Sequence, residues 1–228
     1  MGYDEFKMAK GKLGEEIVLR EIKSIFGEDS LFFQNILIPQ NNNSDRAFEC
    51  DIICISRRGF FVFEVKNWEG HIEADMLCPK WGFRSKTSSN FTQLDNPVMQ
   101  NEMHRKVLSD LLGLQVTSIV VLNNVNNRFS INRYSEELVN VPVLLTSELK
   151  NFFSSNYQND IFSNQQLYSL YSKLSDIENT SNKMKSDWFN SNDNNIQPIS
   201  NIEKDNSNNY QSNYQPNTNE EEHTYYSK

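Results

Sequence analysis

The sequence has few cysteines, no excess of basic residues and no long apolar run, and each absence argues against a class of protein. The three cysteines, Cys50, Cys54 and Cys78, form no CxxC pair, and their odd number fits a reducing cytoplasm better than a disulfide framework. No secretory signal pattern is recognisable, and no apolar run approaches the length of a membrane span. We therefore expect a cytoplasmic protein that does not enter a membrane.

The formal net charge of −8 lacks the basic sign that favours binding to nucleic-acid phosphates. The charge is divided evenly along the chain. Residues 1–177 hold 18 Lys and Arg against 22 Asp and Glu, and residues 178–228 hold 4 against 8. Charge alone thus counts against a nucleic-acid partner, although an acidic cluster that binds a metal would account for part of the deficit.

A change of composition near Glu178 divides the 228 residues into two parts. Residues 178–228 are dominated by Asn, Ser, Gln, Asp and Glu and have no apolar period, so we expect a disordered tail. Trp188, Phe189 and the tyrosines of this tail are candidates for docking a protein partner. Residues 1–177 are long enough to bury a core, and their order of elements predicts an α/β domain with a mixed sheet.

The expected elements follow from apolar spacing and from helix end signals. Asn96-Pro97 is a helix start signal and Gly113 a stop signal. We expect helices over residues 4–26, 97–112, 146–153 and 165–174, strands over 31–38, 47–56, 59–66, 116–122 and 139–145, a hairpin over 71–77 and 81–85, and a polar loop over 123–132.

The two strands expected at 47–56 and 59–66 carry charges inside a strongly apolar run. Such charges cost several kcal/mol each unless they are paired, metal-bound or lining a polar cleft. If Arg57-Arg58 is a two-residue turn, Asp51 lies opposite Glu64 and Glu49 opposite Lys66, with facing Cβ atoms roughly 4.5–5.5 Å apart. A three-residue turn would slip the register by one and separate the carboxylates. We expect the first register, because only it gives the charges a chemical use.

The residues around this hairpin resemble a known family. An acid followed by E-x-K on the next strand, here Asp51 and residues 64–66, is the pattern of the PD-(D/E)xK nuclease superfamily. More closely, the chain resembles the nuclease-related domain, NERD. The matching pieces are Gly11-Lys12-Leu13-Gly14-Glu15, Glu49-Cys50-Asp51, Glu64-Val65-Lys66-Asn67-Trp68-Glu69-Gly70 and Asn96-Pro97-Val98-Met99-Gln100. Cys50 departs from the family, which more often has an aliphatic residue there.

The resemblance implies a restriction-endonuclease-like mixed β-sheet flanked by helices and a metal-dependent deoxyribonuclease, with RNA a less favoured substrate. Asp51, Glu64 and a backbone carbonyl near Val65 offer the hard oxygen ligands that suit Mg²⁺ or Mn²⁺. Lys66 would orient the attacking water or neutralise charge in the transition state. By resemblance, Glu15 projects from the first helix toward this cleft and holds a second metal or a water.

Three further residues have expected roles beside this set. By resemblance, Gln100 faces the site and hydrogen-bonds a phosphate oxygen or a metal-bound water. His104, one turn later, is a candidate phosphate contact, and Glu49 is a candidate partner that holds Lys66 in place. The bland alternatives are a solvated helix face for Glu15, an exposed Gln100, and a buried ion-pair cluster with no catalytic share.

Other interpretations stay open at this point. The domain is alternatively an inactive nuclease-fold module that binds DNA or a protein partner, and pairing of two copies is also open. Lys80, Arg84 and Lys86 are candidates for phosphate contact or for protection of a sheet edge. A zinc site from Cys50, Cys54, Cys78 and His71 lacks ligand spacing. By parity, we expect Cys50 and Cys54 on one strand face as small core residues.

Overall fold

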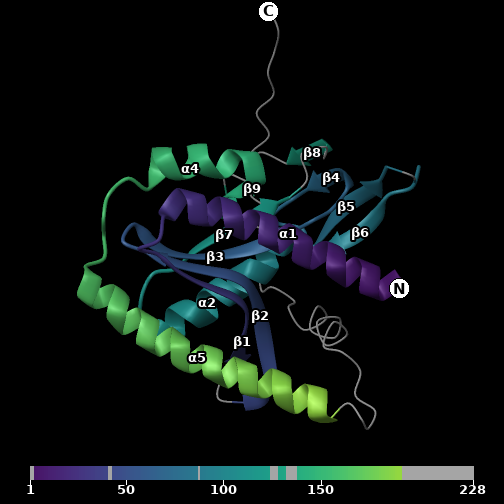
Figure 1. Cartoon of the computed structure of the whole chain (residues 1–228). Helices are drawn as coiled ribbons and strands as arrows, with labels where there is room; N and C mark the ends of the chain where they lie inside the picture. The colour runs from purple at the N-terminus through teal and green to yellow at the C-terminus, as the bar shows by residue number, and fades with distance from the viewer. Residues whose placement is uncertain (1–2, 41–42, 87, 124–127, 132–137, 192–228) are drawn as a thin grey trace, which may run out of the picture. The chain divides into compact units, whose positions relative to one another are not determined.

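The computed structural model describes residues 3–40, 43–86, 88–123, 128–131 and 138–191, and its centre is a mixed five-stranded sheet (Figure 1). The first three strands pair antiparallel, and the last three pair parallel. Their order across the sheet is β1 (Leu31–Gln40), β2 (Asn43–Ser56), β3 (Gly59–Lys66), β7 (Thr117–Leu122) and β9 (Val143–Leu145). The prediction of an α/β fold with a mixed sheet flanked by helices is confirmed.

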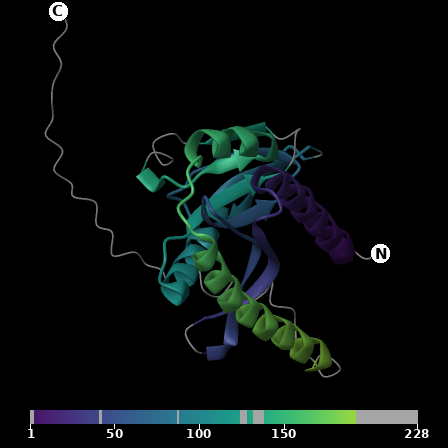
Figure 2. The same ribbon diagram turned by 60° about the vertical axis from the view of Figure 1, so that its left-hand side comes forward.

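Two helices cover each face of this sheet, as Figures 1 and 2 show. α1 (Tyr3–Phe26) and α4 (Leu149–Asn156) share one apolar cluster with the sheet. α2 (Pro97–Leu112) and α5 (Asn164–Ser191) share the cluster on the other face. Burial on both faces explains why β3 is apolar along almost its whole length, with seven of its eight residues buried.

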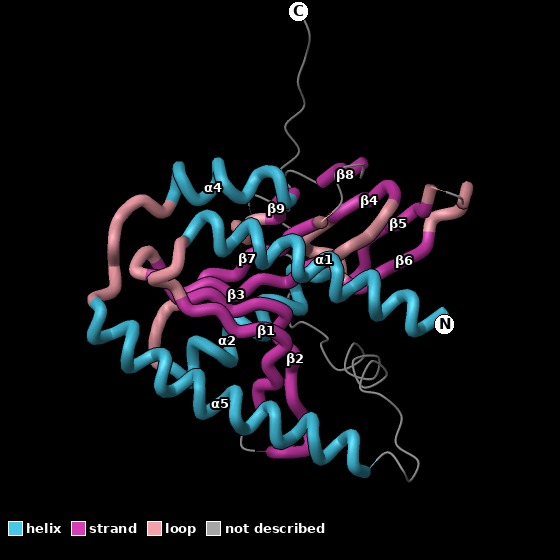
Figure 3. Tube along the Cα trace, in the orientation of Figure 1, coloured by secondary structure: helices cyan, strands magenta, loops and turns pink. Residues whose placement is uncertain are grey.

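A second, four-stranded sheet lies beside the first, and Figure 3 shows its strands near the N-terminal half of α1. Its order is β6 (Thr92–Asp95), β5 (Lys80–Ser85), β4 (Gly70–Ala74) and β8 (Arg128–Ile131). The hairpin expected over 71–77 and 81–85 is present as β4 and β5. The expectation of a loop over 123–132 is wrong for residues 128–131, because β8 pairs with β4 there.

The ends of α2 are those that the sequence predicts. The side chain of Asn96 accepts a hydrogen bond from the backbone N–H of Val98 at 2.9 Å, and Pro97 begins the helix. Gly113 ends it in the left-handed conformation, with φ of 66°. At the other expected helix start, Thr146–Glu148 forms a short 3₁₀ helix, and α4 begins only at Leu149.

The hairpin between β2 and β3 has the expected register. Ser56 pairs with Gly59 and Ile52 with Phe63, so Arg57 and Arg58 form the two-residue turn. The pairing of β2 with β3 ends at Ile52, and beyond it β2 continues beside β1 alone. Figure 3 shows β1 and β2 bending away from β3 beyond this point. Asp51 therefore lies where the sheet divides.

Where β2 separates from β3, the alternation of its side chains between the two faces of the sheet is interrupted. Cys50 packs in the cluster with α2 and α5, whereas Ile52 and Cys54 pack in the cluster with α1 and α4. The expectation that Cys50 and Cys54 share one face is wrong, because strict alternation is interrupted between them. In β1, Asn35 sits at the same level with a left-handed φ of 52°. All three cysteines are free.

The last helix extends past the composition boundary at residue 178. α5 continues to Ser191, so the expectation of disorder is wrong for residues 178–191. Residues 192–228 lie outside the described residues, and the boundary between a domain of 1–177 and a tail remains a prediction. Among the helices of the described ranges, none has the length and apolar character needed to span a bilayer.

Candidate active site

Asp51 lies where β2 separates from β3, and there its side chain, instead of a backbone carbonyl of β2, accepts a hydrogen bond from β3. Its carboxylate Oδ2 accepts a hydrogen bond from the backbone N–H of Val65 at 2.7 Å. Burial raises the pKa of Asp51 well above its usual value, and the charge of Glu64 raises it further, while Lys66 and the Val65 bond oppose the rise. The site thus holds two acidic groups close enough to repel each other.

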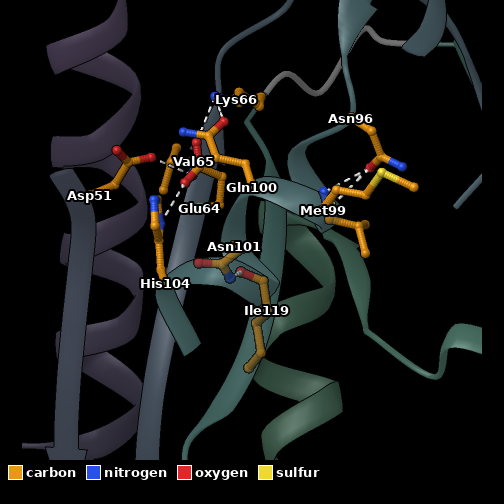
Figure 4. A network of polar contacts seen from close by, with 11 residues as sticks. Asp51, Glu64, Val65, Lys66, Asn96, Met99, Gln100, Asn101, His104 and Ile119 are labelled. Atoms are coloured by element: carbon orange, nitrogen blue, oxygen red, sulfur yellow. Dashed lines mark hydrogen bonds and ion pairs between the residues drawn. The ribbon is translucent and has the colours of Figure 1, made fainter. Parts of the chain in front are cut away.

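Glu64 projects from β3 toward α2 and is almost fully buried, with 1% of its surface exposed. Its Oε1 lies 2.6 Å from the ammonium of Lys66, and its Oε2 lies 3.6 Å from Nδ1 of His104. Figure 4 shows Asp51 and Glu64 pointing toward one another, with Lys66 beside Glu64. The paired residues of the hairpin end one step earlier, at Ile52 and Phe63, and the carboxyl groups of Asp51 and Glu64 lie just beyond this last pair.

Gln100 and His104 lie one turn apart on α2 and both face β3. Oε1 of Gln100 accepts a hydrogen bond from Nζ of Lys66 at 3.1 Å. His104 is 1% exposed, and its ring is tilted by 52° to that of Phe48, with ring centroids 5.7 Å apart. Nδ1 of His104 faces the buried carboxylate of Glu64, and the expected contact of His104 with a phosphate stays a prediction. Its place beside Glu64 makes it part of the inner wall of the site.

α1 approaches the end of β3 at Gly14. A Cβ atom added at Gly14 would lie 2.7 Å from Cβ of Asn67, so only glycine permits this approach. The side-chain amide of Asn67 donates to the carbonyl of Lys10 at 2.8 Å, which ties the helix to the residue that follows Lys66. No described atom lies within 4 Å of a Cβ built on Gly11, so only the second of the two glycines marks a close approach.

This contact brings Glu15 to the acidic group. Burial raises the pKa of Glu15 to about 7, and the nearby charges of Asp51 and Glu49 add to the rise. The polar side chain of Asn35 opposes the rise. Glu15 is half-buried, so its side chain is not on a fully solvated helix face.

Glu49 does not hold Lys66 in the way that the facing register suggested. Oε1 of Glu49 lies 3.9 Å from Nζ of Lys185 on α5, and the ammonium of Lys66 lies at Glu64 instead. The reason is the bend of β2, which carries Glu49 away from β3 together with β1. Glu49 is therefore a rim residue of the acidic group.

The predicted basic cluster of the second sheet is largely paired with acids. Lys80 forms an ion pair with Asp95, and Lys86 lies 2.7 Å from Glu69, which Lys10 also approaches at 3.3 Å. The guanidinium of Arg84 instead lies over the ring of Phe91, 4.9 Å from its centroid.

The donor set suits a hard divalent cation. Asp51 and Glu64 supply carboxylate oxygens, and their mutual repulsion is what a bound cation would relieve. No group of three or more His, Cys, Asp or Glu side chains in the described part of the chain has the arrangement of a metal site. A cation here would therefore depend on two carboxylates, a backbone carbonyl and water. Mg²⁺ commonly keeps several waters in this way.

Two asparagines that sequence reasoning did not single out hold the site together. The fully buried amide of Asn101 donates to the carbonyls of Val62 and Ile119, each at 3.1 Å, and so fixes α2 over β3 and β7. The backbone N–H of Asn123 donates to the carbonyl of Lys66 at 2.9 Å. Asn101 lies four residues after the start signal of α2, and no residue pattern distinguishes it from a surface asparagine.

The chain is similar to a known protein family and to two known proteins. The family model described as NERD, nuclease-related domain, matches residues 10–123. A protein of Bacillus anthracis, uncharacterized protein pXO1-01, is 30% identical over 113 residues, which are 48% of this chain and 50% of that protein. The chain thus spans about half the length of this relative. The crystal structure of protein VC1899 from Vibrio cholerae aligns with 68% of this chain and 35% of its own, at 15% identity and a TM-score of 0.40.

Proposed function

Because the chain belongs to the nuclease-related domain family, we propose that it is a metal-dependent nuclease that hydrolyses phosphodiester bonds of DNA, with RNA a less favoured substrate. The observation that carries the proposal is the group at the end of β3. Asp51 is bound to the Val65 N–H, and Glu64 is buried against Lys66. A buried pair of acids is costly, and such groups concentrate at functional sites.

Asp51, Glu64 and the carbonyl of Val65 are the proposed ligands of Mg²⁺ or Mn²⁺. When bound there, the ion would polarise the scissile phosphate and lower the pKa of a water. The hydrogen bond from Val65 to Oδ2 of Asp51 holds that carboxylate in one orientation. The acids of the site are thereby placed before any ligand arrives.

Lys66 supplies the positive charge that would face the substrate phosphate. Its ammonium lies between Glu64 Oε1 and Gln100 Oε1, at 2.6 and 3.1 Å, so its position is set from two elements. From that position it orients the attacking water or neutralises charge that builds on the phosphate. Gln100 gives its oxygen to Lys66, and its NH₂ group is then the part that would donate to a phosphate oxygen.

Glu15 is the proposed third acid of the cleft. Its pKa of about 7 means that it exchanges a proton near neutral pH, which suits a group that accepts a proton from water. An ionised Glu15 would also suit a second cation or a bound water. Both uses require the carboxyl to stay beside Asp51.

The face of the second sheet that carries His71 and Arg84 is the proposed contact surface for the nucleic acid. His71 pairs across the strands with Arg84, and Phe91 packs against both side chains. Phe91 is 44% exposed, so part of its ring is open to solvent. An aromatic ring with an arginine beside it suits stacking of an unpaired base and contact with a phosphate.

The test of the proposed function is cleavage of plasmid and single-stranded DNA in Mg²⁺ or Mn²⁺. We expect the wild-type chain to cleave, and Asp51→Asn and Lys66→Met to reduce the rate at least about a hundredfold. Lys150→Met serves as the matched control, since Lys150 is an exposed lysine of α4. Cleavage that persists in both site variants, or that is independent of divalent ions, would overturn the proposal.

One observation is also compatible with a second function, an inactive nuclease-fold module that binds DNA or a protein. The contact between Lys66 and Glu64 is short and mostly buried, as expected of a closed ion pair as well as of an active site. DNA binding that survives in Lys66→Met, with no cleavage under Mg²⁺, Mn²⁺, Ca²⁺ or Zn²⁺ in any variant, would identify this module.

A further inference from the structure

Two lysines from different elements share one carboxylate beside the candidate active site. Nζ of Lys86, which directly follows β5, lies 2.7 Å from Oε1 of Glu69, and Nζ of Lys10 on α1 lies 3.3 Å from Oε2. Glu69 itself lies between β3 and β4. We call these three residues the lysine bridge. It holds two positive charges against one negative charge, in a chain whose formal net charge is −8.

The lysine bridge is fixed close to Lys66. The side-chain amide of Asn67, the residue after Lys66, donates to the backbone carbonyl of Lys10 at 2.8 Å. Glu69 follows Lys66 by three residues, which is at most roughly 11 Å of extended chain. Figure 1 shows the N-terminal half of α1 beside the second sheet, and the bridge joins the two. A long ligand bound at Lys66 therefore has the bridge within reach.

The ion pairs of the lysine bridge are open to solvent. The side chains of Lys10, Glu69 and Lys86 are 35%, 46% and 48% exposed. Exposed pairs of this kind contribute little to stability, and dissolved ions screen them. Another anion can therefore replace the carboxylate of Glu69 at small cost.

A backbone phosphate matches the position of the Glu69 carboxylate. The two carboxylate oxygens are bound by different lysines, and a phosphodiester likewise presents two unesterified oxygens that share one negative charge. A lysine ammonium binds phosphate as a compact charge and needs no planar partner. Contacts of this kind supply much of the affinity of proteins for nucleic acids.

The same face of the second sheet continues from the lysine bridge to an aromatic ring. The contact between Glu69 and Lys86 continues the antiparallel register of β4 and β5, and Arg84 lies two residues before Lys86 on the same face. The guanidinium of Arg84 lies 4.9 Å from the ring centroid of Phe91, which is 44% exposed. Stacking on such a ring needs an unpaired base. This order of contacts therefore favours a single strand.

We propose that Lys10 and Lys86 bind a backbone phosphate of single-stranded DNA, and that Glu69 holds the two ammonium groups until this phosphate displaces its carboxylate. Phe91 stacks on a base farther along the same strand. The inference rests on the proposed nuclease function for the identity of the ligand. A bridge that only ties α1 to the second sheet would leave the affinity for DNA unchanged when its lysines are removed.

The test of the two lysines is the affinity of the full chain for a fluorescent single-stranded oligonucleotide, measured by anisotropy in EDTA. We expect Lys10→Met and Lys86→Met each to weaken binding about fivefold at about 0.1 M salt, and each to lower the slope of log affinity against log salt by about 0.7. Lys150→Met, in an exposed lysine of α4, is the matched control and should change neither quantity. Wild-type affinity and slope in both bridge variants would overturn the proposal.

Glu69→Gln should have the opposite sign, because it frees both ammonium groups and keeps the shape of the side chain. We expect the affinity to rise about fivefold or more, whereas Glu16→Gln, in an exposed acid of α1, should raise it less than about twofold. In a chain that also carries Lys10→Met and Lys86→Met, the gain from Glu69→Gln should shrink to that of Glu16→Gln. Equal gains from the two acids in the otherwise wild-type chain would overturn the role of Glu69.

Phe91→Ala tests the preference for a single strand. Loss of one stacked base should weaken binding of the single-stranded oligonucleotide at least about fivefold, and binding of a duplex of the same sequence less than about twofold. Equal losses on the single strand and the duplex would contradict an unpaired base at Phe91.

Binding in EDTA distinguishes failure of this phosphate site from failure of the proposed nuclease function. A chain that cleaves nothing, but loses affinity in the lysine variants, has the phosphate site without the activity. A chain that cleaves DNA while these variants bind as the wild type does is a nuclease without this site. A wild-type chain that binds no single-stranded DNA at low salt overturns the site. Melting temperatures of all variants should stay within a few degrees of the wild type, because the exposed pairs contribute little to stability.

Discussion

Glu15 holds its proton to a higher pH than an ordinary glutamic acid, because burial and the charges of Asp51 and Glu49 disfavour its ionised form. Its pKa rises from 4.5 to about 7 on folding. The folded chain therefore binds more protons than the unfolded chain between these values, and stability falls as pH rises through this window. Above pH 7 the loss is complete and the curve flattens.

Glu15→Gln removes this loss. A shift of this size corresponds to about 3 kcal/mol for a fully shielded group, and partial exposure of Glu15 reduces the expected gain to about 1 kcal/mol. We expect the variant to exceed the wild type in free energy of unfolding at pH 8 and to match it more closely at pH 4.5. Urea denaturation at both pH values measures this. Equal differences at the two pH values would show that Glu15 ionises normally in the folded chain.

Asp51 offers a second test at the scale of one side chain. Asparagine at this position keeps an oxygen for the Val65 N–H and removes the charge that Glu64 opposes. We expect Asp51→Asn to raise the free energy of unfolding at pH 7 by about 1 kcal/mol, the size of one like-charge contact, while it abolishes cleavage. Thermal denaturation beside the cleavage assay measures both. A destabilised variant would mean that Asp51 is mainly a structural residue.

The contact between α1 and the end of β3 is tested by two glycines of one helix. Gly14→Ala would place a methyl group 2.7 Å from Cβ of Asn67, and such overpacking costs about 1–3 kcal/mol. Gly11→Ala meets nothing within 4 Å and should stabilise α1 by up to about 1 kcal/mol through helix propensity. Opposite shifts of the unfolding midpoint are therefore expected. Shifts of the same sign would contradict the close approach at Gly14.

The same elements show how far sequence reasoning extends. The β2–β3 hairpin follows from its apolar runs and from the turn at Arg57 and Arg58, and α2 follows from its end signals at Asn96 and Gly113. β8 was missed because it is four residues long and is held by pairing with β4 rather than by its own pattern. Local signals predict elements that carry their own burial and end signals, and they miss elements made by a partner.

In the site, the residues that share the hairpin were predictable, and those set by its bend were not. The register placed Asp51 against Glu64, and helical spacing placed Gln100 and His104 on one face. The alternation of side chains wrongly placed Glu49 opposite Lys66, because β2 separates from β3 at Asp51. No local sequence pattern marks this separation. The burial of His104 likewise depends on how α2 packs against the sheet, which is tertiary information.

At the scale of the whole chain, the change of composition at residue 178 does not coincide with the end of ordered structure. A helix face needs only a few apolar or small residues at the right spacing, and Ser181 meets this need through one buried hydrogen bond. Average composition is dominated by the exposed face of such a helix and therefore resembles a disordered segment. α5 needs few apolar residues because it packs against β1, an edge strand whose free backbone N–H and C=O groups can hydrogen-bond the helix side chains.

Two shortened chains test the contribution of this last part of α5. A chain of residues 1–177 lacks Ser181, and with it the acceptor of the Leu37 N–H, whereas a chain of residues 1–191 keeps both. The shorter chain loses this hydrogen bond, worth about 1 kcal/mol net, and also the hydrogen bond of the charged Lys185 to the carbonyl of Asn35, worth about 1.5–3 kcal/mol. We expect the 1–177 chain to be less stable than the 1–191 chain by at least about 2 kcal/mol in urea denaturation. Ser181→Ala in the longer chain should reproduce about half of that loss, because it removes the hydroxyl and leaves Lys185 in place. Equal stability of the two chains would mean that residues 178–191 do not bind β1 in solution, and the site would then have to be complete without α5.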